Sequence, residues 1–476
     1  MTHFRISILL LSILAAAAPG VRAQSQSNND EVQQLRQTVA ELERRVAVLE
    51  EQTREVRTDT RDARASGPGA AAALVLAADE LREPESSSAL PQLAATSAPP
   101  MAAPLQGTLP GGATLSYTLD GYYAYNFDHP YDQVNLLRAY DVSSNSFSLN
   151  QAAAIFQLGP DVAAGRRFGV RLDLQYGQAT ATLQGNPVNE ARPDIWRNVF
   201  QAYGTWVAPT RSSLTVDFGK WASALGIEGN YTKDQMNYSR SYYFNYLPYY
   251  HMGARVNYAI NPRLAANYWV VNGTQQTEDQ NGFKDQLFGF VAQPSKTVNW
   301  TFNYYLGQEH PNTVPASNCT APLQPGLCVS PISPAPDGKL HIFDSYATLQ
   351  ASAKLTLAGE ADYVIEREWA NSAPEHVDGG AGYAQYQLDP RAALAARAEY
   401  LSDRGGLFSN QTQALKEATG TYKYSLGDGF DAFLEYRRDW SNRRYFVTSN
   451  PVGPSTHQDT ATLGLVWWYG GKQGAW

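Results

Sequence analysis

The chain has 476 residues, a formal net charge of −8, 17% charged residues and 12% aromatic residues. Soluble globular domains carry about 25% charged residues, so this composition is unusual for a soluble enzyme. The mean hydropathy of −0.39 excludes a polytopic helical membrane protein. After residue 20 no apolar run approaches the roughly 20 residues of a spanning helix. The 29 Tyr, 37 Gly and 10 Trp are typical of a transmembrane β-barrel, in which only every second strand residue meets lipid.

Residues 1–23 have the features of a secretory signal peptide. Arg5 supplies the positive charge, residues 6–18 form an apolar core, and residues 21–23 form a small-x-small cleavage signal. Removing this segment also removes Arg5 and Arg22, so the mature chain is still more acidic than the precursor. An acidic exported chain argues against nucleic acid as a partner.

Residues 24–64 are predicted to form a periplasmic coiled coil. Within residues 31–63, Val32, Val39 and Val46 repeat every seven residues, and leucines repeat at the other core position of the heptad. Such an apolar seam requires partner helices. The core residues alone allow a parallel dimer. A helix lying on a membrane is disfavoured, because the polar side carries as many acids as bases.

Residues 65–112 are rich in Ala, Pro and Ser and are predicted to form a flexible linker. From residue 113 to residue 476 the pattern changes to alternating apolar and polar side chains, interrupted by turn-forming residues, which predicts an outer-membrane β-barrel domain. We expect about sixteen antiparallel strands, over residues 114–127, 145–158, 168–178, 196–207, 214–222, 249–260, 264–272, 284–293, 296–306, 339–350, 354–365, 379–388, 391–402, 412–425, 429–440 and 459–470.

The connections between these segments alternate between short and long. Bacterial outer-membrane barrels have an even number of strands, tight periplasmic turns and long external loops. With sixteen strands, closed by pairing of the first with the last, both ends of the barrel domain lie on the periplasmic side. A soluble β-sandwich is disfavoured, because the apolar rows end in Tyr and Trp, as in the aromatic girdles of membrane barrels.

The polar face of each strand is expected to line the lumen, because an Arg on the lipid face costs roughly 2–4 kcal/mol at the midplane. Sixteen strands enclose a lumen that side chains alone do not fill, which favours a pore over a sealed, self-neutralised interior. Acids slightly outnumber bases among the inward residues and indicate a weak preference for cations. The predicted pore-lining residues are Arg171, Asp173, Arg197, Asp217, Arg240, Arg255, Glu360, Asp362, Arg397, Glu399, Glu435, Arg437 and Asp439.

The third long connection, residues 223–248, contains Arg240 and leads into an aromatic run at residues 242–250. Two interpretations stay open for this run. It lines a constriction if the connection folds into the lumen, as the third loop of sixteen-stranded porins generally does. It belongs to the rim girdle of the sixth strand if the connection stays outside. Arg240 and Arg255 are expected near the constriction.

Ordered short motifs resemble those of the OmpL-like β-barrel porin family over roughly residues 114–470. They are GYYAYNFDHP at 121–130, NSFSLNQA at 145–152, FGVRLDL at 168–174, NYSRS at 237–241 and HMGAR at 251–255. The resemblance implies an outer-membrane barrel with pore activity and no catalytic residues. The N-terminal coiled coil is similar, in architecture only, to that of trimeric phosphate-selective porins. Since sixteen-stranded porins are commonly trimeric, a homotrimer is expected.

The sequence therefore predicts a porin of the Gram-negative outer membrane that allows passive diffusion of small hydrophilic solutes or ions. The alternative is a membrane anchor whose coiled coil tethers the barrel to the cell wall or an envelope partner. No nucleophile elbow, HExxH, Walker or dinucleotide motif is present, so neither an enzyme nor a cofactor is expected. Cys319 and Cys328 are close together in an exported chain and are predicted to form a disulfide.

Overall fold

The computed structural model describes residues 107–184, 190, 192–210, 214–310, 314–315, 322–324, 327–328 and 337–471. The predicted signal peptide, the coiled coil and residues 65–106 of the linker lie outside the described residues. The predicted disulfide does too, because Cys319 is not among them. Residues 107–112, the end of the predicted linker, form strand β1 (Gly107–Leu109) and the 3-10 turn η1 (Pro110–Gly112).

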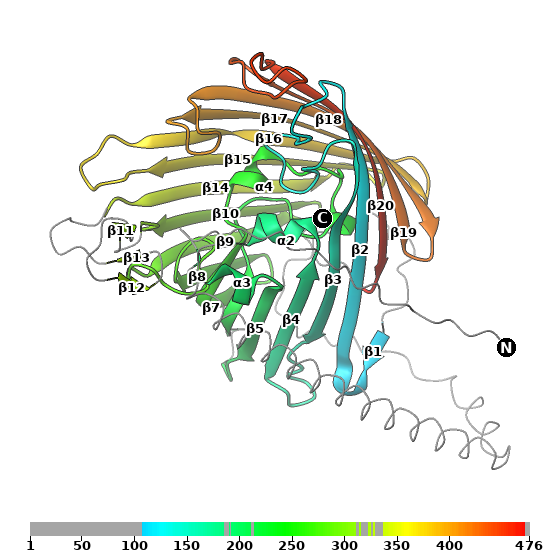
Figure 1. Cartoon of the computed structure of the whole chain (residues 1–476). Coiled ribbons are helices and arrows are strands. Elements are labelled where there is room, and N and C mark those ends of the chain that lie inside the picture. Colours follow the sequence, from blue (N-terminus) through cyan, green and yellow to red (C-terminus); the bar gives the residue numbers. More distant parts are fainter. Residues whose placement is uncertain are drawn as a thin grey trace, which may run out of the picture. The chain divides into compact units, whose positions relative to one another are not determined.

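The described domain is a closed antiparallel barrel in which successive long strands are neighbours (Figure 1). Their period-2 alternation suits a sheet with one face in lipid and the other in a polar interior. The barrel strands are β2 (Ala113–Asn126), β3 (Ser146–Leu158), β4 (Phe168–Tyr176), β5 (Val199–Val207), β6 (Leu214–Ala222), β7 (Tyr250–Asn261), β8 (Leu264–Val271), β9 (Asp285–Ser295), β10 (Val298–Gly307), β14 (Leu340–Gln350), β15 (Leu355–Glu366), β16 (Glu375–Gln387), β17 (Ala392–Arg404), β18 (Gln413–Gly427), β19 (Phe430–Ser441) and β20 (His457–Tyr469).

Pairing of β2 with β20 closes the barrel. Tyr117 lies opposite Tyr469 at one end of this pair, and Asn126 lies opposite Thr460 at the other. A closed sheet leaves no unpaired edge, which a strand in lipid requires because hydrocarbon offers no hydrogen-bond partner. The prediction of sixteen strands closed by the first and last is confirmed, and β2 begins at the end of the barrel where β20 finishes.

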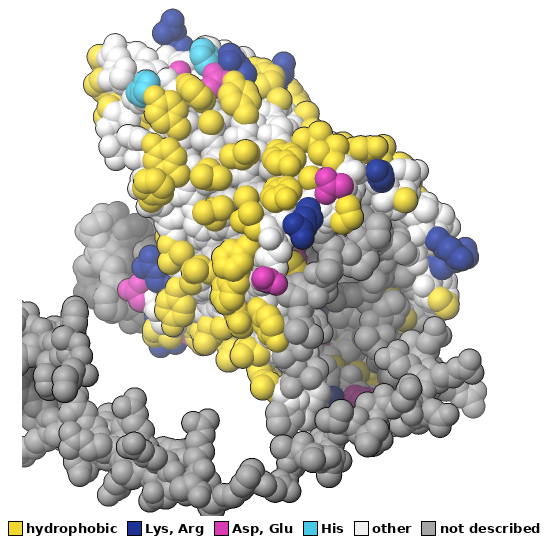
Figure 2. Space-filling view, turned by 90° about the vertical axis from the view of Figure 1, so that its right-hand side faces the viewer, with side chains coloured by type: hydrophobic (Ala, Val, Ile, Leu, Met, Phe, Trp, Pro, Cys, Tyr) yellow, Lys and Arg dark blue, Asp and Glu magenta, His cyan; other side chains and the backbone are white. Residues whose placement is uncertain are grey.

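The two faces of the strands differ as the alternation predicts. On β20, Leu463 and Leu465 are 42% and 52% exposed, whereas the flanking Thr462 and Val466 are buried. Figure 2 shows hydrophobic side chains covering much of one outer face of the barrel. Buried Asp, Glu and Arg side chains instead lie on the inward face of the strands, where they avoid lipid.

Short turns and long loops alternate around the barrel. The β18–β19 turn consists of Asp428 and Gly429, whose φ angles are 52° and 79°. Positive φ at both central residues is the type I′ geometry that matches the twist of a two-residue hairpin. The connections at the end where β2 begins have two to nine residues, and those at the other end have eight or more.

The long loops carry the short helices of the domain. They are α2 (Gln178–Leu183), α3 (Pro193–Trp196), the 3-10 turn η2 (Thr232–Asp234) and α4 (Tyr242–Tyr246). The loop after β10 contains the small strands β11 (Val314–Pro315), β12 (Pro322–Gln324) and β13 (Leu327–Cys328). Within the described part of the chain, no helix has the length and apolar character needed to cross a membrane.

Two predicted strand boundaries are wrong. The strand predicted from residue 196 begins at Val199, because Pro193 starts the helical turn α3 and Arg197 keeps helical φ and ψ angles. The strand predicted from residue 379 begins at Glu375, because Gly379 sits within β16 instead of ending a turn. A Cβ atom at Gly379 would collide with the hydroxyl of Tyr243, so this glycine makes room for a loop side chain.

The turn geometry generates a stability prediction. Gly429→Ala should lower the free energy of unfolding by about 1 kcal/mol, because a Cβ atom is disfavoured at positive φ. The matched control is Gly420→Ala on the adjoining strand, where an added Cβ atom meets nothing within 4 Å. Urea unfolding of both variants in lipid vesicles measures the difference. Equal stability of the two would contradict the turn assignment.

Candidate functional site

The third long connection, residues 223–249 and here called loop 3, lies inside the barrel. Figure 1 shows its helix α4 within the ring of strands. Arg240, Tyr242 and Tyr243 of this loop are each 0% exposed. The Ser241 hydroxyl caps α4 by accepting a hydrogen bond from the Phe244 N–H at 2.9 Å. The first two residues of the aromatic run, Tyr242 and Tyr243, therefore lie in the lumen.

Apolar packing explains part of this inward path. Leu225, Ile227 and Leu247 of loop 3 form one buried cluster with inward-facing wall residues such as Trp269 and Tyr305. Burial of a large apolar side chain stabilises a fold by roughly 1.5–3 kcal/mol. The largest apolar core of the domain therefore lies between loop 3 and the inner wall.

On β14 and β15, carboxylates of the inner wall accept hydrogen bonds from backbone N–H groups of loop 3. The Gly226 N–H donates to Asp344 at 3.1 Å, and the Ile227 N–H donates to Glu360 at 3.2 Å. A buried N–H group without a partner costs about 1–3 kcal/mol, so these acceptors allow a loop to enter the lumen.

The same arrangement recurs on β17 and β19. Glu435 accepts the N–H groups of Tyr238 and Ser239 at 2.7 and 2.9 Å. Glu399 accepts the Tyr242 N–H at 3.0 and 2.9 Å from its two oxygens. Hydrogen bonds to a charged acceptor are roughly twice as strong as neutral ones. Wall carboxylates therefore hold the loop backbone more firmly than neutral acceptors would.

Arg397 joins the wall to loop 3 and offsets these negative charges. Its guanidinium pairs with Glu417 of β18 at 2.8 Å and with Glu228 of loop 3 at 3.0 Å. It also donates to the carbonyl of Ser239 at 2.8 Å. Both Glu417 and Arg397 are at most 2% exposed, so neither charge has solvent as an alternative partner.

Loop 1, residues 127–145, enters the lumen beside this network. Arg138 of this loop pairs with Asp439 at 2.6 Å. Asp439 also pairs with Arg437 at 2.7 Å and accepts the hydroxyl of Tyr242 at 2.8 Å. One wall carboxylate therefore links loop 1, loop 3 and β19.

Loop 3 also reaches the opposite wall. Asp120 on β2 accepts the hydroxyls of Thr232 and Tyr238 at 2.6 and 2.7 Å. Asp173 on β4 accepts the hydroxyl of Tyr231 at 2.7 Å. Since the same loop binds β14, β15, β17 and β19, it spans the cross-section of the barrel.

Lys233 shows how far loop 3 reaches along the barrel. Its ammonium donates to the carbonyl of Gly471, beyond the end of β20, at 2.8 Å and lies 5.3 Å from the ring centre of Trp468. Burial lowers the pKa of Lys233 below its ordinary value, and Asp234 opposes this effect by pairing with it. The tip of loop 3 thus lies near the short-turn end.

Arg240 and Arg255, expected near a constriction, are both held by several partners. Arg240 donates to the carbonyls of Tyr238 and Gly229 at 2.8 and 3.1 Å, so it fixes the fold of loop 3 itself. Arg255 on β7 pairs with Asp217 at 2.7 Å and lies 4.9 Å from the ring centre of Trp221. The side chain of Arg255 remains 18% exposed, whereas Arg240 is fully enclosed.

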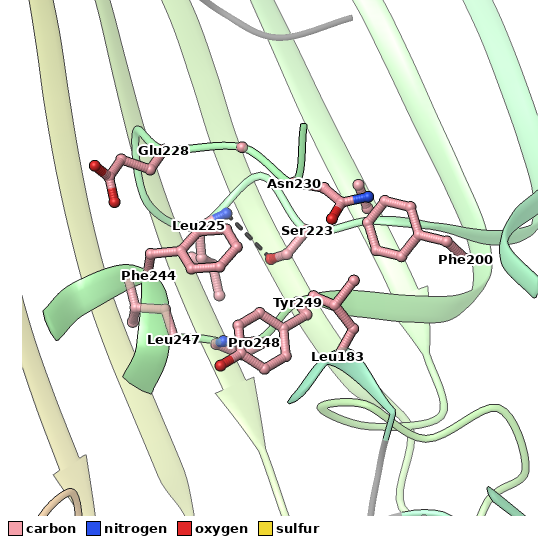
Figure 3. A pocket seen from close by; sticks show the side chains of 12 residues that line it. Leu183, Phe200, Ser223, Leu225, Glu228, Asn230, Phe244, Leu247, Pro248 and Tyr249 are labelled. Atoms are coloured by element: carbon pink, nitrogen blue, oxygen red, sulfur yellow. Dashed lines mark hydrogen bonds between the residues drawn. The ribbon is translucent and has the colours of Figure 1, made fainter. Parts of the chain in front are cut away.

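A cavity of about 40 Å³ lies beside loop 3 (Figure 3). Phe244 and Tyr249 of the loop, Leu183 of α2 and Phe200 of β5 line it. A buried water needs about 10–15 Å³, so the cavity accommodates a few waters at most. It is therefore a gap between α2, β5 and loop 3, not a site for a large solute.

The structure brings most of the predicted pore-lining residues into one connected inner surface. Arg197 is the exception: it follows α3 in the long loop before β5, and its side chain is 49% exposed. The predicted residues that lie on barrel strands and face inward are Arg171, Asp173, Asp217, Arg255, Glu360, Asp362, Arg397, Glu399, Glu435, Arg437 and Asp439.

Sequence reasoning missed several charged residues of this surface. Asp120, Asp344 and Glu417 lie within strands that were correctly predicted, and their position in the alternation marks them as inward. Arg138 and Glu228 lie in loops, where no periodicity indicates which way a side chain points. Only the path of the loops brings these two residues to the wall.

A closed sixteen-stranded barrel with an apolar outside, a charged inner wall and an inward third loop has the architecture of an outer-membrane porin. Over residues 112–467 the sequence matches the family model described as "Putative beta-barrel porin-2, OmpL-like", and the chain belongs to this family. No curated protein matches the sequence.

Solved outer-membrane proteins resemble the chain only distantly. The anion-selective porin from Comamonas acidovorans has 8% identity and a TM-score of 0.47, covering 75% of this chain and 99% of its own. The channel DcaP of Acinetobacter baumannii has 10% identity and a TM-score of 0.47, covering 77% and 100%. OmpT of Vibrio cholerae has 9% identity and a TM-score of 0.43, covering 75% and 98%. Such low similarity does not indicate what this chain transports.

The buried network generates a second stability prediction. Arg397→Met should destabilise the barrel by about 3–5 kcal/mol, because it leaves Glu228 buried without its cation and Glu417 with only the longer pair to Arg437 at 3.5 Å. Arg404→Met is the matched control on the same strand. Arg404 pairs with Asp378 at 2.5 Å but is 52% exposed, and exposed pairs contribute about 0–1 kcal/mol. Urea unfolding followed by tryptophan fluorescence compares them; a loss below 1 kcal/mol for Arg397→Met would refute the bridging role.

Proposed function

We propose that this chain is a passive diffusion channel of the outer membrane for small hydrophilic solutes or ions. Family membership supports the assignment to the porins. The observation that carries the proposal is that loop 3 is bound across the lumen by charged groups of both walls. Such a loop narrows the passage and brings permeating solutes close to fixed charges. Solute size and charge then decide what crosses the barrel.

The charges of the inner wall favour cations over anions. Acidic residues on the inward faces of the barrel strands outnumber basic ones. The acids are Asp120, Asp173, Asp217, Asp285, Asp344, Glu360, Asp362, Glu399, Asp403, Glu417, Asp431, Glu435 and Asp439, and the bases are Arg171, Lys220, Arg255, Arg397, Lys423 and Arg437. A narrow space between low-dielectric walls strengthens the field of such an excess.

The orientation of the barrel follows from the lengths of its connections. Short turns face the periplasm and long loops face outward in outer-membrane barrels. The barrel domain would then begin and end at the periplasmic side, where the predicted coiled coil of residues 24–64 has room to assemble.

A membrane anchor remains the second candidate function. The inward paths of loop 1 and loop 3 favour it, because they occupy lumen space that a wide channel would leave open. In this case the predicted coiled coil would be the active part, as a tether to the cell wall or to an envelope partner. The two functions differ in one measurable property, the ion conductance of the barrel.

Planar-bilayer recording under a salt gradient tests the channel. The wild-type protein should conduct, with a reversal potential on the cation-selective side. Glu399→Gln combined with Glu435→Gln should raise conductance and reduce cation preference, because the loop loses two charged acceptors and the wall loses two negative charges. Glu368→Gln, in an exposed loop position, is the control and should change neither property.

Each other outcome of the recording counts against part of the proposal. A silent wild-type barrel would contradict the channel and favour the anchor. An anion-selective reversal potential would contradict the role of the acidic wall. Unchanged conductance in the double variant would contradict the placement of loop 3 at the narrowest zone.

Self-association is the second property to be tested. We expect a homotrimer in mild detergent, because the heptads of residues 31–63 require partner helices. Deletion of residues 24–64 should weaken the trimer. Native mass measurement of both proteins gives the answer: a wild-type monomer would contradict self-association, and a wild-type dimer would contradict the trimer.

A further inference from the structure

Three carboxylates meet on the inner wall behind loop 3. Asp344 on β14 and Asp362 on β15 are direct cross-strand partners, and Glu360 lies two residues from Asp362 on the same strand. One oxygen of each carboxylate lies within 4.8 Å of those of the other two. Their residues are 0%, 4% and 6% exposed, respectively, so water does not screen the cluster.

This arrangement is unfavourable for three bare negative charges. Like charges placed directly opposite each other destabilise a strand pair. Burial increases the cost, because an uncompensated charge away from water is penalised by several kcal/mol. Among the described ion pairs none includes Asp344, Glu360 or Asp362, and the nearby Arg397 is bound to Glu228 and Glu417. The wall itself therefore supplies no neutralising side chain.

The hydrogen bonds of the three residues differ in an informative way. Asp344 accepts bonds from Gly226 and Asn303, the latter at 2.8 Å. Glu360 accepts bonds from Ile227 and from the hydroxyl of Tyr383, at 3.2 Å each. Asp362 is equally buried, yet in the described structure neither of its oxygens has a hydrogen-bond partner outside the three carboxylates. Its carboxylate points toward the other two and lacks a hydrogen-bond donor or cation from outside the cluster.

We propose that Asp344, Glu360 and Asp362 form a binding site for a divalent cation, best suited to Ca²⁺. The cation supplies the missing partner of Asp362 and neutralises most of the charge of the cluster. It joins β14 to β15 directly behind the point where the Gly226 and Ile227 amides attach loop 3. Cation binding at this site is measured without conductance, so the inference does not depend on the channel function proposed above.

Three carboxylates offer only oxygen ligands, which hard cations such as Ca²⁺ and Mg²⁺ prefer. Ca²⁺–O distances of about 2.3–2.6 Å allow ligand oxygens up to about 5 Å apart. Mg²⁺–O distances of about 2.1 Å require them within about 4.2 Å and in strict octahedral geometry. Oxygens within 4.8 Å of one another, an upper limit on their separations, suit either ion, and an irregular set of three carboxylates favours Ca²⁺ because Ca²⁺ tolerates irregular coordination. The alternative is that Asp344 and Asp362 share a proton, in which case Ca²⁺ is not bound near pH 7.

Calorimetric titration of the full-length protein with CaCl₂, in detergent after chelator treatment, tests the site. The wild-type protein should bind one Ca²⁺ per chain, and Ca²⁺ should raise its unfolding temperature. Asp362→Asn should weaken binding about tenfold or more and abolish the thermal shift. Asp378→Asn is the matched control: Asp378 lies on the neighbouring strand, is half-exposed and pairs with Arg404, so binding should be unchanged.

Electrophoresis with and without heating identifies folded barrels before titration. If Asp362→Asn does not fold, Glu360→Gln replaces it with the same expected loss. Absence of Ca²⁺ binding to the wild-type protein would overturn the proposal and favour the shared proton. Equal binding by the folded site variant and the wild type would also overturn it, by placing the cation elsewhere. Because the assay needs no membrane, a silent channel and a missing cation site are distinguishable.

Discussion

A loop can enter the interior of a membrane barrel only if its backbone N–H groups find acceptors there. Loop 3 meets this requirement with wall carboxylates: Glu435 accepts two N–H groups, and both oxygens of Glu399 accept the Tyr242 N–H. Carboxylates are strong acceptors, but they bring negative charge into a buried place. Buried negative charge is unfavourable unless a cation lies beside it. Arg397 and Arg437 supply these cations, because they lie among the acids that hold the loop. The carboxylates that attach the loop therefore also determine the charge of the inner wall.

Acidic side chains pair with arginines on one part of the inner wall but not on another. On β17–β19, arginines of the wall and of loop 1 pair with the acids. On β14 and β15 the acids hold loop 3 through Gly226 and Ile227 with no arginine among them. This difference separates a self-neutralised region from one that attracts cations. An acidic zone beside the loop is consistent with a lumen that favours cations over anions.

The sequence predicts the barrel well because strand structure depends on local pattern. Alternation along 391–402 or 459–470 indicates which residues face lipid, and the residues between strands indicate the turns. The path of loop 3 depends on contacts between residues more than 100 positions apart, such as Tyr242 with Glu399. Arg240 illustrates the limit, since its type suggests a pore-lining charge but its bonds go to its own loop. Arg197 shows that a proline-initiated turn can override an alternating pattern by a few residues.

Hydrogen–deuterium exchange of the folded protein tests most directly whether loop 3 is fixed to the wall. The amides of Gly226, Ile227, Tyr238, Ser239 and Tyr242 donate to buried carboxylates, so they should exchange as slowly as barrel strands do. The exposed loop around Val452, which is 89% exposed, provides the fast reference. Slow exchange across residues 226–242 is the predicted result. Exchange at the rate of the Val452 loop would contradict the account.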